Sequence, residues 1–144
     1  MFGKKFQKEP TEKQKIGKMG EDLACQYLEK NGHKIIERNY LKKWGEIDIV
    51  TGKAKKIHFI EVKSVSREIS DSKEGNVIHE TNDSYRAEDN MHPWKLQRLR
   101  RAIQSYLLDR NIVDDVDWQF DVMAVHIDQN RGLHKVFLME DIVL

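Results

Sequence analysis

Two segments with the alternating pattern of β-strands are separated by one short turn, and this spacing constrains the fold more than any other sequence feature. The strands cover residues 46–51 and 56–65, and the turn covers residues 52–55. So short a connection predicts an antiparallel hairpin, because parallel strands need a much longer crossover. The hairpin therefore fixes which residues of the two strands lie opposite each other.

Polar side chains interrupt both strands of this hairpin on one predicted face. Side chains alternate between the faces of a strand, so Glu61 and Lys63 point the same way. Counted back from the turn, Asp48 lies opposite Phe59 or Glu61, and Asp48 and Glu61 then share a face. The apolar positions are expected to pair as Ile47 with Ile49 on one face of the first strand and Ile60 with Val62 on one face of the second.

Apolar residues at helical spacing predict one helix before the hairpin and one after it. The first runs through Ile16 and Leu28 and ends at Asn31 and Gly32, where glycine suits a left-handed cap. The second begins at Pro93, because proline is favoured in the first turn of a helix. Further strands are expected at residues 33–39, 118–127 and 133–143.

This order of elements predicts one α/β domain over residues 12–144. The strands before and after the second helix should run parallel, because a right-handed crossover through that helix joins them. We therefore expect a mixed five-stranded sheet flanked by helices. Residues 1–11 are expected to form a flexible basic tail. Residues 66–91 are polar and acidic, and their length is typical of a functional or disordered loop.

The composition predicts the cellular compartment of the protein but says little about its binding partner. Cys25 is the only cysteine, which excludes an internal disulfide and suits a reducing cytosol. No apolar run approaches the roughly 20 residues that span a bilayer, and the polar N-terminus lacks the pattern of a signal peptide. We therefore expect a cytoplasmic protein that does not enter membranes. The net charge of +1 excludes no class of partner, because basic and acidic segments alternate along the chain.

If the polar side chains of the hairpin lie close together, they can form a site for a divalent cation. Two carboxylates, Asp48 and Glu61, can hold a hard divalent cation beside the ammonium group of Lys63. That combination suits phosphodiester hydrolysis. The structural alternatives are that Asp48 is a strand-end residue near a turn and that Glu61 and Lys63 are a solvated pair on an exposed sheet face.

Glu21 is a further acidic candidate. Its position on a helical wheel places it near the border of the apolar stripe, beside Leu28, so that it can face the edge of the interior. The alternative is a surface glutamate near the start of the helix, where a negative charge complements the helix dipole.

Three motifs together resemble the YraN family, a branch of the restriction-endonuclease-like PD-(D/E)xK nucleases. They read Gly20-Glu21-Asp22-Leu23-Ala24, Gly45-Glu46-Ile47-Asp48 and Phe59-Ile60-Glu61-Val62-Lys63. The resemblance implies a restriction-endonuclease-like fold and a Mg²⁺ site, with Mn²⁺ as a substitute. Asp48 and Glu61 would be the main ligands, and the Val62 carbonyl could add a further one. Glu21 would join them or hold a metal-bound water, and Lys63 would orient the attacking water or stabilise the charge on the phosphate.

The second helix carries candidates for contacts with nucleic acid. Lys95, Arg98 and Arg101 lie off its apolar stripe and could contact phosphates, and Trp94 could stack on a base. The alternatives are an ordinary solvated helix face and a tryptophan that packs at the helix start.

These observations predict a Mg²⁺-dependent nuclease that hydrolyses phosphodiester bonds of DNA, including branched or structured DNA. Two other functions stay open: a non-catalytic nucleic-acid-binding module, and an interaction protein that uses its acidic loop. The sequence also leaves a homodimer open, since the junction-cutting nucleases that the chain resembles form pairs.

Overall fold

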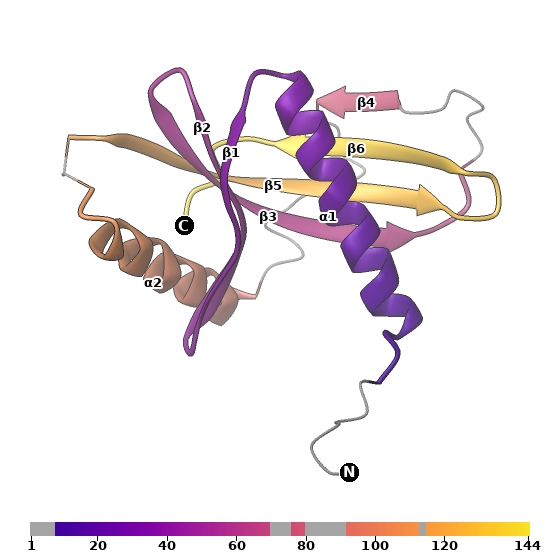
Figure 1. Cartoon of the computed structure of the whole chain (residues 1–144), viewed down its shortest axis with the longest axis horizontal. Coiled ribbons are helices and arrows are strands. Elements are labelled where there is room, and N and C mark those ends of the chain that lie inside the picture. The colour runs from indigo at the N-terminus through magenta and orange to yellow at the C-terminus, as the bar shows by residue number, and fades with distance from the viewer. Residues whose placement is uncertain (1–7, 70–75, 80–91, 113–114) are drawn as a thin grey trace, which may run out of the picture.

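One mixed sheet of six strands forms the centre of the protein, in the order β1-β2-β3-β5-β6-β4 (Figure 1). The β1–β2, β2–β3 and β5–β6 pairs are antiparallel, whereas β3–β5 and β4–β6 are parallel. The predicted parallel pairing across the second helix is therefore confirmed. The strands are β1 (Lys34–Lys42), β2 (Gly45–Lys53), β3 (Lys56–Ser66), β4 (Asn76–His79), β5 (Asp117–Asp128) and β6 (Leu133–Met139).

The computed structural model describes residues 8–69, 76–79, 92–112 and 115–144. It confirms the predicted α/β class and the mixed sheet, but the sheet has six strands and not five. The additional strand, β4, lies inside the segment predicted to be a loop. It pairs with β6 at the edge of the sheet, and at four residues it is too short to show a period in the sequence. The rest of the predicted acidic loop beyond Ile69, and most of the predicted basic tail, lie outside the described residues.

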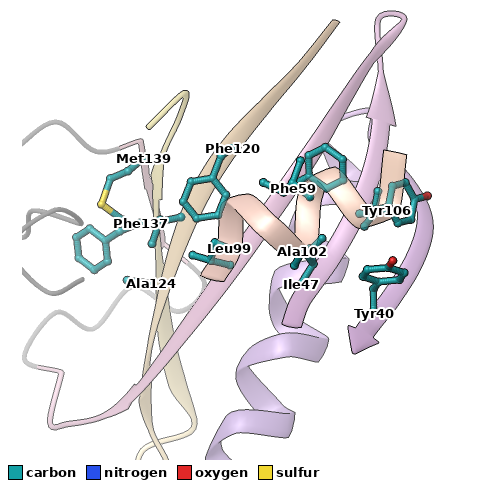
Figure 2. Close-up of a cluster of buried hydrophobic side chains, with 13 residues drawn as sticks. Tyr40, Ile47, Phe59, Leu99, Ala102, Tyr106, Phe120, Ala124, Phe137 and Met139 are labelled. Atoms are coloured by element: carbon teal, nitrogen blue, oxygen red, sulfur yellow. The ribbon is translucent and has the colours of Figure 1, made fainter. Parts of the chain in front are cut away.

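Two helices cover the opposite faces of the sheet (Figure 1). Helix α1 (Glu12–Lys30) packs Ala24 and Leu28 against Ile60 and Met123. Helix α2 (Pro93–Asp109) packs its apolar stripe against the other face, where aromatic rings fill the core (Figure 2). That second core contains Tyr40, Ile47, Phe59, Leu99, Ala102, Tyr106 and Phe120.

Helix α1 begins and ends as its sequence predicts. The Thr11 hydroxyl accepts a hydrogen bond from the Gln14 backbone, and the Gln14 side chain accepts one from the Thr11 backbone, which is a complete capping box. Gly32 follows the helix with φ of 90°. The helix lies very close to β3 at Gly20, where an added Cβ would lie 1.8 Å from Ser64 Oγ. Only glycine therefore permits this approach.

The β2–β3 hairpin has the predicted antiparallel register, with Ile49 opposite Ile60. Its turn is made by Ala54 and Lys55, both with positive φ (52° and 62°), a conformation that matches the twist of the flanking strands. The prediction that Ile47 and Ile49 share a face is wrong. Ile47 packs in the α2-side core and Ile49 in the α1-side core.

The reason is that the ladder between β2 and β3 ends at the Ile49–Ile60 pair. Beyond that pair β2 is no longer held in the register of β3, and the simple alternation fails at Asp48.

Strand β6 ends at Met139, so the predicted strand through residue 143 is too long. Asp141 has φ of 57°, which breaks the extended backbone. The chain then folds back onto β5, where the Ile142 backbone donates to the Phe120 carbonyl at 2.7 Å. The Asp141 backbone donates to the Asp121 carboxylate at 2.9 Å.

Asp121 belongs to a group of buried polar residues, which we call the histidine cluster: His33, Thr51, His58, Gln119 and Asp121. His58 Nδ1 lies 2.9 Å from Asp121 Oδ2, and the Gln119 amide donates to Asp121 Oδ1 at 2.7 Å. His33 Nδ1 lies 2.6 Å from Thr51 Oγ1, and the His33 and His58 rings meet edge to face at 4.8 Å. Each of these side chains has a polar partner inside the protein. None of the described helices is long and apolar enough to span a membrane.

Candidate functional site

Asp48 lies where strands β2 and β3 separate. The last residue pair of their ladder is Ile49 with Ile60, and Asp48 is the next residue of β2. Its carboxylate accepts a hydrogen bond of 2.8 Å from the Val62 backbone, which extends the contact between the strands by a side chain. Asp48 is therefore an interior residue of β2, and the alternative of a strand-end residue near a turn is wrong.

A cavity of about 240 Å³ opens between this point and the first turns of α2, and we call it the acid cavity. Asp48 and Glu61 both line it, so the structure brings the two hairpin acids together as the register predicted. The side chain of Glu61 is only 10% exposed, which excludes a solvated surface role. The remaining lining residues are Gly45, Glu46, Trp94, Lys95, Arg98 and Leu99.

Electrostatics in the acid cavity disfavour two free carboxylates. Burial, followed by repulsion from the Glu61 carboxylate, raises the pKa of Asp48 to about 8, although the Val62 hydrogen bond acts in the opposite direction. The pKa of Glu46 is also raised, by desolvation first and then by the charges of Glu61 and Glu21. A cation placed among these groups would relieve both effects.

The structure already places one cation beside Glu61. Lys95 Nζ lies 2.8 Å from Glu61 Oε2 and reaches it from the first turn of α2. Sequence reasoning assigned Lys95 to phosphate contacts and did not predict this ion pair. The two residues are more than thirty positions apart, and no local pattern reveals that the start of α2 lies over β3.

Glu21 lies on the other side of Asp48. It lines a second, larger cavity of about 1020 Å³ on the α1 side, together with Glu46, Asp48 and Val62. Its side chain is 15% exposed and therefore faces the edge of the interior, not open water. Glu21 Oε1 accepts from Arg38 Nη2 at 2.7 Å and from the Asn39 amide at 3.1 Å. Asp48 thus borders both cavities, and Glu21 approaches it from the face opposite Glu61.

Lys63 follows Glu61 on the same face of β3, opposite Ala124 of β5. It is partly buried, and it lines neither of the two cavities. Among the residues that the structure describes, the side chain of Lys63 forms no hydrogen bond or ion pair. The structure therefore brings Asp48 and Glu61 into one cavity, places Glu21 in a neighbouring cavity, and leaves Lys63 outside the lining of both.

The ligand chemistry of this arrangement fits Mg²⁺ in a water-rich site. Within the described ranges no three side chains of His, Cys, Asp or Glu are grouped closely enough to hold a metal by themselves. Mg²⁺ usually keeps several waters and takes one or two protein carboxylates. Asp48 and Glu61 supply such a pair, and burial together with repulsion from Glu61 raises the pKa of Asp48.

Aromatic and basic side chains form the rim of the acid cavity. Trp94 is 52% exposed, which excludes tight packing at the helix start, and the Arg98 guanidinium lies 5.5 Å from the centre of its ring. Arg98 Nε donates to the Trp44 carbonyl at 2.8 Å, and Arg101 lies over the Trp44 ring at 5.2 Å. These contacts organise the side chains beyond what a solvated helix face requires.

Two residues of this site were missed from the sequence: Glu46, which lines both cavities, and Trp44, which anchors the rim. The motif that contains Glu46 was recognised, but strand alternation places Glu46 and Asp48 on the same face with no signal to separate their roles. Trp44 lies in the β1–β2 turn, and nothing in the local sequence shows that this turn contacts α2.

The mixed α/β sheet with a helix on each face is consistent with a restriction-endonuclease-like fold, and this fold is the class of protein that the structure defines. Residues 20–125 match the model of the uncharacterised protein family UPF0102. The chain belongs to this family, which is the YraN family that its motifs predicted. Family membership leaves the activity open.

Several UPF0102 proteins are similar to this chain over most of its length. The relative from Flavobacterium johnsoniae is 32% identical over 118 residues, which cover 81% of this chain and 85% of that protein. The relative from Alkaliphilus metalliredigens is 34% identical over 122 residues, covering 84% and 93%. The Vibrio parahaemolyticus relative is 31% identical over 125 residues, covering 86% and 90%.

Proposed function

We propose that this protein is a metal-dependent nuclease that hydrolyses phosphodiester bonds of DNA, including branched or structured DNA. The observation that carries the proposal is the convergence of Asp48 and Glu61 in one cavity with a basic and aromatic rim. The carboxylates are buried at a cost that binding of a divalent cation would offset.

Bound by Asp48 and Glu61, Mg²⁺ (or Mn²⁺ in its place) would neutralise phosphate charge and acidify a water molecule. The Val62 carbonyl is a further candidate ligand, since Val62 adjoins Asp48. Lys63, on the Glu61 face of β3, would orient the attacking water or stabilise the developing charge. Glu21 would hold water on the opposite side of Asp48, and Arg38 fixes its position.

The rim would bind the nucleic acid. Arg98 and Arg101 carry the positive charge that phosphates require, and the half-exposed ring of Trp94 offers a stacking surface for a base. A cytoplasmic location and a homodimer stay predictions that accompany this function. So does the acidic-loop interaction alternative, because that loop lies largely outside the described residues.

Metal binding is the first test, because it needs no knowledge of the substrate. Titration calorimetry with Mn²⁺ should give a saturable heat for the wild type and none for Asp48→Ala. Asp117→Ala is the matched control, since it removes an exposed carboxylate from the start of β5 and should leave the heat unchanged. A wild type that gives no saturable heat would contradict the proposed site.

Cleavage is the second test. Linear, single-stranded and branched DNA should be incubated with the protein in Mg²⁺ and in Mn²⁺. Glu61→Ala and Lys63→Ala should each lower the cleavage rate by about a hundredfold or more, because each removes a group that acts in the transition state. DNA binding that survives in both variants, without cleavage by any of the proteins, would favour the non-catalytic binding module.

A further inference from the structure

Lys95 occupies a position that helix stability does not explain. It lies in the first turn of α2, and that turn contains no acidic residue. The amino end of a helix carries partial positive charge, so a lysine there is disfavoured unless a negative group compensates for it. The compensating group comes from another element, because Lys95 Nζ lies 2.8 Å from Glu61 Oε2 of β3.

This ion pair joins a buried carboxylate to a partly exposed lysine. The Glu61 side chain is 10% exposed, whereas the Lys95 side chain is 38% exposed. Arg98, the other cationic side chain that lines the acid cavity, is already engaged with the Trp44 carbonyl and the Trp94 ring. Lys95 is therefore the cation of the described cavity lining that neutralises a carboxylate and also has room to move.

The lysine and a divalent cation would compete for the Glu61 carboxylate. Mg²⁺ needs carboxylate oxygens at about 2.0–2.1 Å, and an ammonium group in contact with Glu61 would repel the ion at short range. Lysine has a flexible four-carbon stem, so its tip can leave one anion for another nearby. In a working complex, a substrate phosphate at the rim, beside Trp94 and Arg98, would offer such an anion.

We propose that Lys95 takes the place of the divalent cation at Glu61 in the metal-free protein and transfers to a substrate phosphate when the metal binds. This inference rests on the proposed nuclease function and deepens it. It gives Lys63 of β3 and Lys95 of the cavity lining separate tasks. Lys63 stays beside the reacting water, and Lys95 couples metal loading to phosphate binding.

The metal half of the proposal is tested by Mn²⁺ titration of the Lys95→Met variant. Its Mn²⁺ affinity should rise by about tenfold, because the substitution removes both a competitor and a repulsive charge. Lys95→Arg keeps the charge and should stay close to the wild type. Arg101→Met removes a cation from the same helix outside the cavity lining, and it should also leave the Mn²⁺ affinity unchanged.

The phosphate half is tested by binding of branched DNA in EDTA and in Ca²⁺, which serves here as a hard cation for measurements without turnover. Lys95→Met should weaken DNA binding severalfold in Ca²⁺ and reduce the salt slope by about one phosphate contact. In EDTA it should have no effect, because Lys95 is then held by Glu61. Arg101→Met should weaken binding equally in both conditions.

The outcomes separate this inference from the proposed function. A wild type without a saturable Mn²⁺ heat would overturn both. A wild-type heat that disappears in Asp48→Ala but has the same affinity in Lys95→Met would overturn the role of Lys95 alone. Equal loss of DNA affinity by Lys95→Met in EDTA and in Ca²⁺ would also overturn it, since Lys95 would then be a permanent phosphate contact.

Discussion

Strands β2 and β3 carry a buried polar group at each end of their pairing. Near the turn, the histidine cluster places Thr51 opposite His58, and every side chain in it has a partner inside the protein. At the other end the strands separate, and Asp48 and Glu61 line a cavity in which burial and repulsion from Glu61 raise the pKa of Asp48. The comparison shows that burial of polar groups alone does not identify a functional site. A carboxyl group with a raised pKa beside open space is what distinguishes one end from the other.

The largest expected effect lies at the satisfied end. Asp121→Ala should lower the free energy of unfolding by about 3–5 kcal/mol, because it leaves His58, the Gln119 amide and the Asp141 backbone without their acceptor. Asp121→Asn keeps an acceptor and should cost clearly less. Urea unfolding of the three proteins measures this, and equal stabilities would show that the histidine cluster is not a stability element.

The second effect is an increase in the free energy of unfolding, and it is expected at the end of the strand pair where Asp48 lies. The folded-state pKa of Asp48, about 8, is above the ordinary value of a carboxyl group, so the folded protein binds a proton more tightly than the unfolded chain. Wild-type stability without metal should therefore fall as the pH rises from about 4 to 8.

Asp48→Asn removes that loss and should stabilise the protein at pH 9 by about 2–4 kcal/mol. Thermal unfolding in EDTA across this pH range measures the difference from wild type. Asp117→Asn, an exposed carboxylate, is the control and should change little. An Asp48→Asn protein that is less stable than wild type at pH 9 would contradict the raised pKa of Asp48.

The third effect is a loss of stability as the pH falls, and it is expected in the histidine cluster. Burial, followed by repulsion from His58, lowers the pKa of His33 to about 4. The unfolded chain then binds the proton first, so wild-type stability is lost as the pH falls from about 6.5 to 4.

His33→Gln should retain about 1–2 kcal/mol of that lost stability at pH 4. His126, whose pKa is also lowered to about 4, accounts for a further part and is unaffected by this change. Unfolding measured from pH 4 to pH 7 checks the difference, with His134→Gln as the control. Parallel curves for His33→Gln and wild type would contradict the assignment.

The smallest effect is the loss of one hydrogen bond. Thr51→Val removes the hydroxyl that lies 2.6 Å from His33 Nδ1 and keeps the shape of the side chain. The expected cost is about 1 kcal/mol. Chemical denaturation measures it. A variant as stable as wild type would mean that His33 finds another partner, which would weaken the distinction between the two ends.

Local sequence patterns predicted much of the fold, because its elements are long and regular. The two helices, the turn of the hairpin and the parallel β3–β5 pair follow from spacing. Strand β4 did not follow, because its stability comes from the partner strand β6 and not from its own period. The face of Ile47 was wrong for a related reason, since alternation assumes a continuous ladder and this ladder stops beside Asp48.

The candidate site was predicted in its chemistry and only partly in its geometry. Register alone brings Asp48 and Glu61 together, because both lie on one hairpin. Contacts between distant elements carried no local signal: Glu21 with Arg38, and Glu61 with Lys95. The histidine cluster was invisible for the same reason, since His58 and Asp121 are 63 positions apart.

The turn between β2 and β3 has a practical consequence. Ala54 and Lys55 hold a backbone conformation that asparagine and glycine adopt more readily. Replacing this pair by Asn-Gly should therefore raise the stability of the protein. The turn lies at the far end of the hairpin from Asp48, and the gain would not alter the acids. In a protein stabilised at this turn, destabilised variants could be purified and compared at one temperature.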